Sequence, residues 1–188
     1  MAAGFQFPTY HAFPPFFTLQ INEDLKRKQL AMWGDLVCAY CQNKDQYFVD
    51  FEPVAPMFAN ETIQRKLTPE GLAAVAQHLV DTGRGVWIDA GSAGASPSGA
   101  GVTGKRMLVL WKPAQQWAEL IYKWADDSGL IGNVETLFAL YTGADTDGQE
   151  FFDKPPELIR AAIDVLVGQR RAEWIRDPAG DSVKFLRA

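Results

Sequence analysis

Apolar positions recur at helical spacing over several stretches of this chain, and short runs rich in β-forming residues lie between them. From Asn22 to Tyr40, apolar side chains return every three or four residues, and Asn22 is a residue type that commonly caps helices. This pattern predicts an amphipathic helix over roughly residues 23–42. A β-rich run predicts a strand over 47–51, and the residues after it predict a second, shorter helix around 61–66.

A third helix is predicted from Pro69 to Thr82. Thr68 can cap this helix, proline suits its first position, and Gly83 can end it. A β-hairpin is predicted next, with strands at residues 86–88 and 107–111. The Gly/Ala/Ser-rich residues 90–104 between them are predicted to form a flexible wing. The first half of the chain is therefore predicted to run helix, strand, helix, helix, hairpin.

The second half of the chain repeats this order. Apolar spacing predicts one helix around residues 117–124 and another over residues 134–141. Residues 69–88 align without gaps on residues 156–175, at a constant offset of 87 residues. Both copies end in Trp-Ile, and a further strand is predicted after the second copy at 182–186.

Two similar halves of about 80 residues indicate a duplicated domain. A trio of helices whose third member runs into a two-stranded wing is typical of the winged helix, a variant of the helix-turn-helix. We therefore predict an α+β protein with two tandem winged-helix domains, residues 22–112 and 113–188, preceded by an N-terminal arm, residues 1–21. An unclassified α+β protein is the alternative.

The N-terminal arm is rich in aromatic side chains and proline and carries almost no charge over residues 5–17. Paired prolines hold φ at about −65° and disfavour helix in the preceding residue, so we expect an extended arm and domain cores that begin after Asn22. Because proline reduces the entropy lost on binding, we predict that the arm binds other proteins. The predicted binding residues are Phe13, Pro14, Pro15, Phe16 and Phe17. In the alternative, these rings cover the core of the first domain, and both can hold for different rings.

Composition and charge narrow the classes of partner. Of the 188 residues, 47% are hydrophobic and 22% are charged, as in ordinary folded proteins. The net charge of −5 disfavours nucleic acid and anionic lipid as partners. The chain has neither an apolar run of about 18 residues nor a signal-peptide pattern at its start, so we expect a cytosolic protein.

The two cysteines, Cys38 and Cys41, form a C-x-x-C pair like that of thiol oxidoreductases. This pair lies late in the predicted first helix, on its buried side, whereas a redox pair lies at a helix start. Zinc needs four ligands, and only His11 and His78 accompany the cysteines. We therefore expect two buried structural thiols.

Other short motifs are incomplete. Residues 145–148 begin like a calcium loop, but Pro156 stands where the closing glutamate belongs. Residues 94–98 resemble a nucleophile elbow without its final glycine, and His78 has no evident catalytic partner. The sequence therefore predicts no catalytic residue, no cofactor and no metal site, and hence a protein that is not an enzyme.

Winged helices often place their third helix in the DNA major groove. In the first domain this helix contains no Lys or Arg, and in the second domain the basic residues Arg160, Arg170 and Arg171 are offset by acidic neighbours. A DNA-binding transcriptional regulator is therefore kept only as the alternative function.

The stretch FPPFFTLQ at residues 13–20 resembles the N-terminal peptide of the vacuolar-protein-sorting subunits that form the arms of ESCRT-II, the second endosomal sorting complex. The family often has Trp where this chain has Phe13. Further resemblances to landmarks of that family extend over nearly the whole chain, at residues 56–60, 65–67, 117–124, 136–137, 143–146 and 183–185.

This resemblance implies a non-catalytic adaptor made of two winged-helix domains. It implies that the PPFF peptide docks onto the two other ESCRT-II subunits and that each complex holds two copies of this subunit. The second domain is expected to recruit an ESCRT-III subunit of the charged multivesicular body class, for sorting ubiquitinated cargo. The expected location is the cytoplasm, with recruitment to the endosomal membrane through other subunits, and no nucleic-acid partner is expected.

Overall fold

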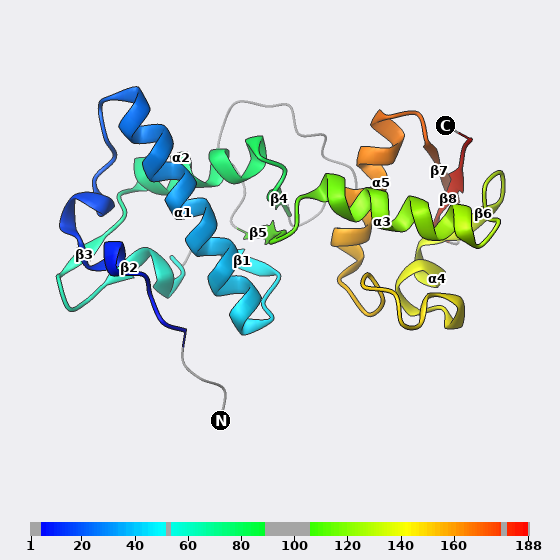
Figure 1. The fold of residues 1–188 in the computed structure, drawn as a ribbon, viewed down its shortest axis with the longest axis horizontal. Coiled ribbons are helices and arrows are strands. Elements are labelled where there is room, and N and C mark those ends of the chain that lie inside the picture. Colours follow the sequence, from blue (N-terminus) through cyan, green and yellow to red (C-terminus); the bar gives the residue numbers. More distant parts are fainter. Residues whose placement is uncertain (1–4, 52–53, 89–105, 178–179, 188) are drawn as a thin grey trace. The chain divides into compact units, whose positions relative to one another are not determined.

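The computed structural model describes residues 5–51, 54–88, 106–177 and 180–187 (Figure 1). The stretch predicted as a flexible wing, 90–104, and the elbow-like residues within it lie outside the described residues. The chain divides into two compact units, an N-terminal unit of residues 1–111 and a C-terminal unit of residues 112–188.

The N-terminal unit is built on the long helix α1 (Glu23–Lys44), which confirms the first predicted helix. The Asn22 side chain accepts hydrogen bonds from the backbone N–H groups of Asp24 and Leu25, so it caps the helix as expected. The helix ends where Asp45 adopts a left-handed conformation with a φ of 48°. The side of α1 that includes Trp33 faces the core.

A second helix and a small sheet complete this unit. Helix α2 (Pro69–Asp81) begins at Pro69, and the hydroxyl of Thr68 accepts the Gly71 N–H, as predicted. The sheet has the order β1-β5-β4 with antiparallel pairing, and its strands are β1 (Phe48–Asp50), β4 (Gly85–Trp87) and β5 (Arg106–Val109). The core lies between α1, α2 and this sheet.

The short helix predicted around residues 61–66 is wrong. The turn η3 (Pro56–Phe58) leads into the antiparallel strands β2 (Ala59–Asn60) and β3 (Arg65–Lys66), which form a small hairpin. Two local features exclude a helix. The Asn60 side chain accepts the Thr62 N–H, and Gln64 has a φ of 53°, which closes the turn in the left-handed region.

The C-terminal unit begins with α3 (Ala114–Asp127) and has its own three-stranded sheet, in the order β6-β8-β7, in which β6 is Val134–Thr136. Helix α5 (Pro156–Gly168) leads into strands β7 (Ala172–Asp177) and β8 (Gly180–Phe185), as the repeat predicts. The core of this unit includes Trp117, Phe151 and Phe185, which are almost completely buried.

The helix predicted over residues 134–141 is only partly correct. Its first residues form strand β6 (Val134–Thr136), and helix α4 (Leu137–Thr142) begins after them. Strand β6 pairs with β8, and the Thr136 hydroxyl accepts the Ala139 N–H and thereby fixes the start of the helix. Residues 134–136 are therefore a strand despite their helical apolar spacing, because they pair with a strand far along the chain.

The internal repeat extends to details of side-chain contacts. Helices α2 and α5 each have 13 residues and begin 87 positions apart. Arg84 and Arg171 are also 87 positions apart: Arg84 Nη1 lies 2.7 Å from Asp35 Oδ1 on α1, and Arg171 Nη1 lies 2.6 Å from Glu119 Oε1 on α3. Each arginine therefore connects the residues after α2 or α5 to the first helix of the same unit, α1 or α3.

Candidate docking site

The N-terminal segment, residues 5–20, is not an extended arm. It contains two short 3-10 helices, η1 (Thr9–Ala12) and η2 (Pro14–Phe17), drawn in dark blue in Figure 1. Proline suits the first position of such a turn, and the Phe13 carbonyl accepts the Phe16 N–H at 3.0 Å. The paired prolines therefore start a turn where we expected an extended chain.

Two of the predicted binding residues lie in the core of the N-terminal unit. Phe16 is 5% exposed and Phe17 is 2% exposed. The Phe16 ring stacks on Trp33 of α1 at a centroid distance of 4.3 Å, and the Phe17 ring meets Trp33 edge-on at 5.4 Å. The expectation that this core begins after Asn22 is therefore wrong.

Polar side chains of α1 bind the backbone of the segment. Gln29 Nε2 donates to the carbonyls of Phe16 at 2.8 Å and Thr18 at 2.9 Å, and Gln29 Oε1 accepts the Gln20 N–H at 3.1 Å. Trp33 Nε1 donates to the Phe16 carbonyl at 3.1 Å. These bonds satisfy backbone groups that burial would otherwise leave unpaired. The same bonds satisfy the side-chain amide of Gln29, which is itself buried.

A second set of contacts holds the beginning of the segment. His11 is buried, and its Nε2 lies 3.1 Å from the Met57 carbonyl. Asn60 Nδ2 donates to the His11 carbonyl at 2.8 Å, and the Phe7 ring stacks on the imidazole at 4.2 Å. Burial lowers the pKa of His11 below its usual range, and the hydrogen bond to Met57 partly offsets this effect.

The other three predicted residues are exposed. Phe13 is 59% exposed, and Pro14 and Pro15 are also exposed. The five predicted residues therefore divide into a buried pair, Phe16 and Phe17, and an exposed run, residues 13–15, that precedes it directly. Sequence reasoning missed two further exposed apolar side chains, Ile21 and Leu25. Ile21 precedes α1 and Leu25 lies in its first turn, where helical spacing predicts a place on the apolar side, so no signal in the sequence indicates its exposure.

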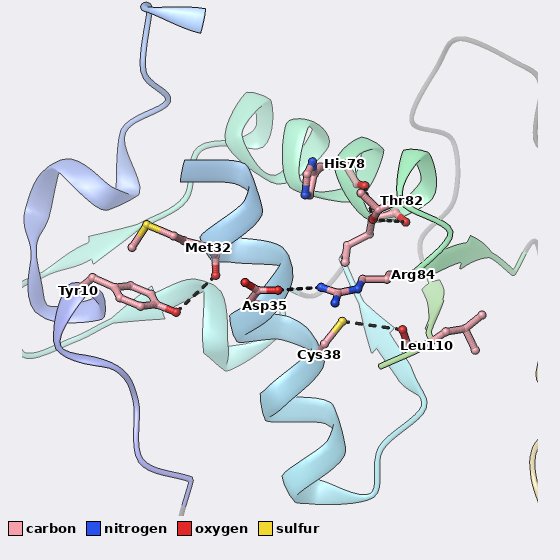
Figure 2. A network of polar contacts seen from close by, with 9 residues as sticks. Tyr10, Met32, Asp35, Cys38, His78, Thr82, Arg84 and Leu110 are labelled. Carbon is pink, nitrogen blue, oxygen red and sulfur yellow. Dashed lines mark hydrogen bonds and ion pairs between the residues drawn. The ribbon is translucent and has the colours of Figure 1, made fainter. Parts of the chain in front are cut away.

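Figure 2 shows the polar contacts of α1 with Tyr10, with Arg84 after α2 and with Leu110 after β5. The Arg84 guanidinium binds Asp35, and the Cys38 thiol points to the Leu110 carbonyl at 3.9 Å. Burial raises the pKa of Cys38 to about 11 and that of Cys41 to about 12. Both thiols therefore stay protonated at neutral pH, which is unfavourable for thiol exchange.

The calcium-like loop is held by protein contacts. Trp124 Nε1 donates to the Asp145 carbonyl at 3.2 Å, and the Thr146 hydroxyl donates to the Gly143 carbonyl at 2.8 Å. Across the described residues, no group of three or more His, Cys, Asp and Glu side chains could hold a metal ion. Within the same residues, no helix is long and apolar enough to cross a membrane.

If the chain were a DNA-binding regulator, helices α2 and α5 would be expected to meet DNA, and these helices offer few free cations. Helix α2 contains no Lys or Arg. On α5, the Arg160 guanidinium binds Asp181 and lies over the Trp174 ring. Arg171 binds Glu119 and lies 3.8 Å from the centroid of the Tyr122 ring. These side chains are engaged within the C-terminal unit, and phosphate would have to compete with these contacts.

Comparison with known proteins identifies the family of this chain. The family model described as ESCRT-II complex subunit matches residues 10–155, and the chain belongs to this family. It is similar to vacuolar protein-sorting-associated protein 25 of Xenopus laevis, with 34% identity over 185 residues, which cover 97% of this chain and 99% of that protein. The protein of the same name from Homo sapiens is 34% identical over 188 residues, which cover 99% and 100% of the two chains.

Solved structures give the same result. The crystal structure of subunit VPS25 of the endosomal trafficking complex ESCRT-II matches with a TM-score of 0.72 and 27% identity, over 95% of this chain and 98% of that chain. A chain in the crystal structure of the endosomal complex ESCRT-II (VPS22/VPS25/VPS36) matches with a TM-score of 0.70 and 28% identity, over the same shares. The predicted α+β class and the resemblance to ESCRT-II are confirmed, and nothing supports the DNA-binding alternative.

Proposed function

We propose that this chain is an assembly subunit of ESCRT-II without catalytic activity, which docks onto the two other kinds of subunit through its N-terminal segment. The observation that carries this proposal is the exposure of Phe13, Pro14 and Pro15 directly beside a buried base formed by Phe16 and Trp33. The similarity to a chain of a complex that contains VPS22, VPS25 and VPS36 supports partners of the VPS22 and VPS36 kinds.

The physical argument for docking rests on exposed apolar area and restricted motion. A 59% exposed phenylalanine next to two exposed prolines presents apolar surface to water, and covering it with a partner groove is favourable. The segment is already fixed by Gln29 and Trp33, so binding loses little conformational entropy. Aromatic side chains in such a setting often dominate the binding energy.

The finer organisation is part of the same proposal. Each unit is a winged-helix domain, and the order of helices and the three-stranded sheet in each unit support this. Two copies of the chain bind per complex, and the C-terminal unit recruits an ESCRT-III subunit. The protein works in the cytoplasm and reaches the endosomal membrane through other subunits, in the sorting of ubiquitinated cargo.

Reconstitution tests this function directly. The tagged chain is co-expressed with VPS22 and VPS36 subunits, and the purified species are weighed by mass photometry. We expect a stable complex whose mass corresponds to one copy of each partner and two copies of this chain. Recovery of the chain as a free monomer, with the partners associated only with each other, would refute the proposal.

A further inference from the structure

His11 and Asn60 define each other's hydrogen-bonding state. Asn60 Oδ1 accepts the Thr62 N–H at 3.0 Å, which directs the amide nitrogen of Asn60 toward His11. That nitrogen lies 2.8 Å from the His11 carbonyl and 3.3 Å from Nδ1, so one of its two hydrogens faces the ring. Nδ1 is therefore the acceptor, and Nε2 carries the proton that is donated to the Met57 carbonyl.

A charged imidazole would not fit this arrangement. In the imidazolium form both ring nitrogens are donors, so the Nδ1–H would face the donor N–H of Asn60. His11 is 3% exposed and has lost most of its hydration. Desolvation by burial is the principal cause of its lowered pKa, and no carboxylate contributes to that shift. The site thus selects the neutral ring.

Within the described part of the chain, the hydrogen-bond and ring contacts of the imidazole are all with uncharged groups. The ring contacts from η2, α1, η3 and β2 come from Phe17, Trp33, the Met57 carbonyl and Asn60, respectively. The titratable neighbours are tyrosines: Tyr10 precedes His11 and hydrogen-bonds the Met32 carbonyl, while Tyr40 packs against the Phe7 ring that covers the imidazole. Protonation of His11 would therefore place an unpaired charge in an apolar site.

The exposed run of residues 13–15 lies between two anchor points. On one side, His11 is fixed to Met57 and Asn60, and the Phe13 N–H donates to the Tyr10 carbonyl at 3.1 Å within the same turn. On the other side, Phe16 is buried against Trp33. Without the His11 anchor the run would be held from one side only, and Phe13 would sample more positions.

We propose that neutral His11 is the positioning residue of the docking site, fixing Phe13 in the place from which it meets a partner subunit. This inference rests on the proposed docking function. His11 itself does not touch the partner: it acts through the backbone of η1. The expected partners are those of the proposed function. Their affinity for the chain is expected to depend on His11 being uncharged.

The expected pH dependence follows from the lowered pKa. A free histidine has a pKa of about 6.5, and the folded chain keeps His11 neutral to lower pH. The ordering provided by His11 is therefore fully present above about pH 6.5 and is lost as the pH falls through the lowered pKa of the folded state. A glutamine can keep the donor to Met57 and the acceptor for Asn60 without titrating.

Three chains test the inference: wild type, His11→Gln and His11→Ala. Hydrogen exchange of the Phe13 amide in the isolated chain is compared between them at about pH 7.5 and at a lower pH at which the NMR titration shows His11 to be protonated. At the higher pH, we expect equal exchange rates in wild type and His11→Gln, and about tenfold faster exchange in His11→Ala. At the lower pH, we expect wild type to be less protected than His11→Gln, which does not titrate. Equal pH profiles for wild type and His11→Gln would overturn the inference.

Binding gives the second readout. At about pH 7.5, His11→Ala is expected to bind the partner subunits about tenfold more weakly than wild type, and His11→Gln to recover most of that loss. Wild-type affinity in His11→Ala would also overturn the inference. If wild type itself does not bind, the docking function fails, while the exchange experiment still decides whether His11 positions Phe13. The His78→Gln variant leaves His11 as the one histidine of the chain, so that its NMR titration is assigned unambiguously.

Discussion

The Phe16 ring stacks on Trp33 at a centroid distance of 4.3 Å and an interplanar angle of 14°, so a side chain of the N-terminal segment, residues 5–20, belongs to the core of the N-terminal unit. The same tryptophan donates its Nε1–H to the Phe16 carbonyl at 3.1 Å. One residue of α1 therefore fixes both the side chain and the backbone of Phe16. The N-terminal segment is consequently part of the fold of this unit.

Phe16→Ala should destabilise the isolated chain by about 3–5 kcal/mol, as for other buried phenylalanines. Calorimetric unfolding measures this loss. The matched control is Phe13→Ala, which removes an exposed ring and should change stability by no more than about 0.5 kcal/mol. Deleting residues 1–20 should lower the midpoint of the N-terminal unit by about 10 °C or more. An unchanged midpoint after deletion would mean that residues 1–20 do not stabilise this unit, as expected for the extended arm that the sequence predicts.

Gln29→Ala should cost about 2–3 kcal/mol, because it leaves the carbonyls of Phe16 and Thr18 and the Gln20 N–H without their partner. Urea denaturation measures the change. Gln42→Ala is the control, since Gln42 lies exposed on the same helix. Similar effects of the two substitutions would mean that the hydrogen bonds of Gln29 contribute little to holding the segment.

The thiols of Cys38 and Cys41 should resist alkylation in the folded chain. With a pKa of about 11, only about one Cys38 thiol in a thousand is ionised at pH 8, and burial restricts access further. Iodoacetamide labelling followed by mass spectrometry should be slow for the native chain and fast after unfolding in guanidinium. Rapid labelling of the native chain at pH 8 would contradict the structural role.

Binding of this chain to duplex DNA should be negligible at about 150 mM salt, because α2 supplies no cation and the arginines Arg160 and Arg171 are engaged by carboxylates. Fluorescence anisotropy with labelled duplexes measures it. A sub-micromolar affinity that depends on base sequence would favour the transcriptional alternative.

Local patterns were sufficient for the long elements. The spacing of apolar residues and the caps at Asn22 and Thr68 predicted helices α1 and α2, and the repeat predicted α5. They were insufficient at Val134, whose strand conformation depends on pairing with β8, about 50 residues further along the chain. Local spacing carries no information on such a distant partner.

The docking site was only half predictable for a related reason. An aromatic and proline-rich composition shows that the rings must be covered, but it does not show by what. Phe16 and Phe17 are covered by Trp33, whereas Phe13 remains exposed. The contribution of His11 was also missed, because its partners Met57 and Asn60 lie more than 40 residues away, in η3 and β2, just before the residues that were predicted as a short helix.

The most direct test of the docking account is the affinity of Phe13→Ala for the VPS22 and VPS36 partners, measured by isothermal titration calorimetry beside wild type. The matched control is Phe138→Ala, which removes a ring that is 66% exposed in the C-terminal unit. We expect Phe13→Ala to weaken binding about 30-fold, as the loss of about 2 kcal/mol at an interface hot spot would, while its thermal midpoint stays that of wild type. Phe138→Ala should bind like wild type. Equal affinities for wild type and Phe13→Ala would contradict docking through the exposed run of residues 13–15.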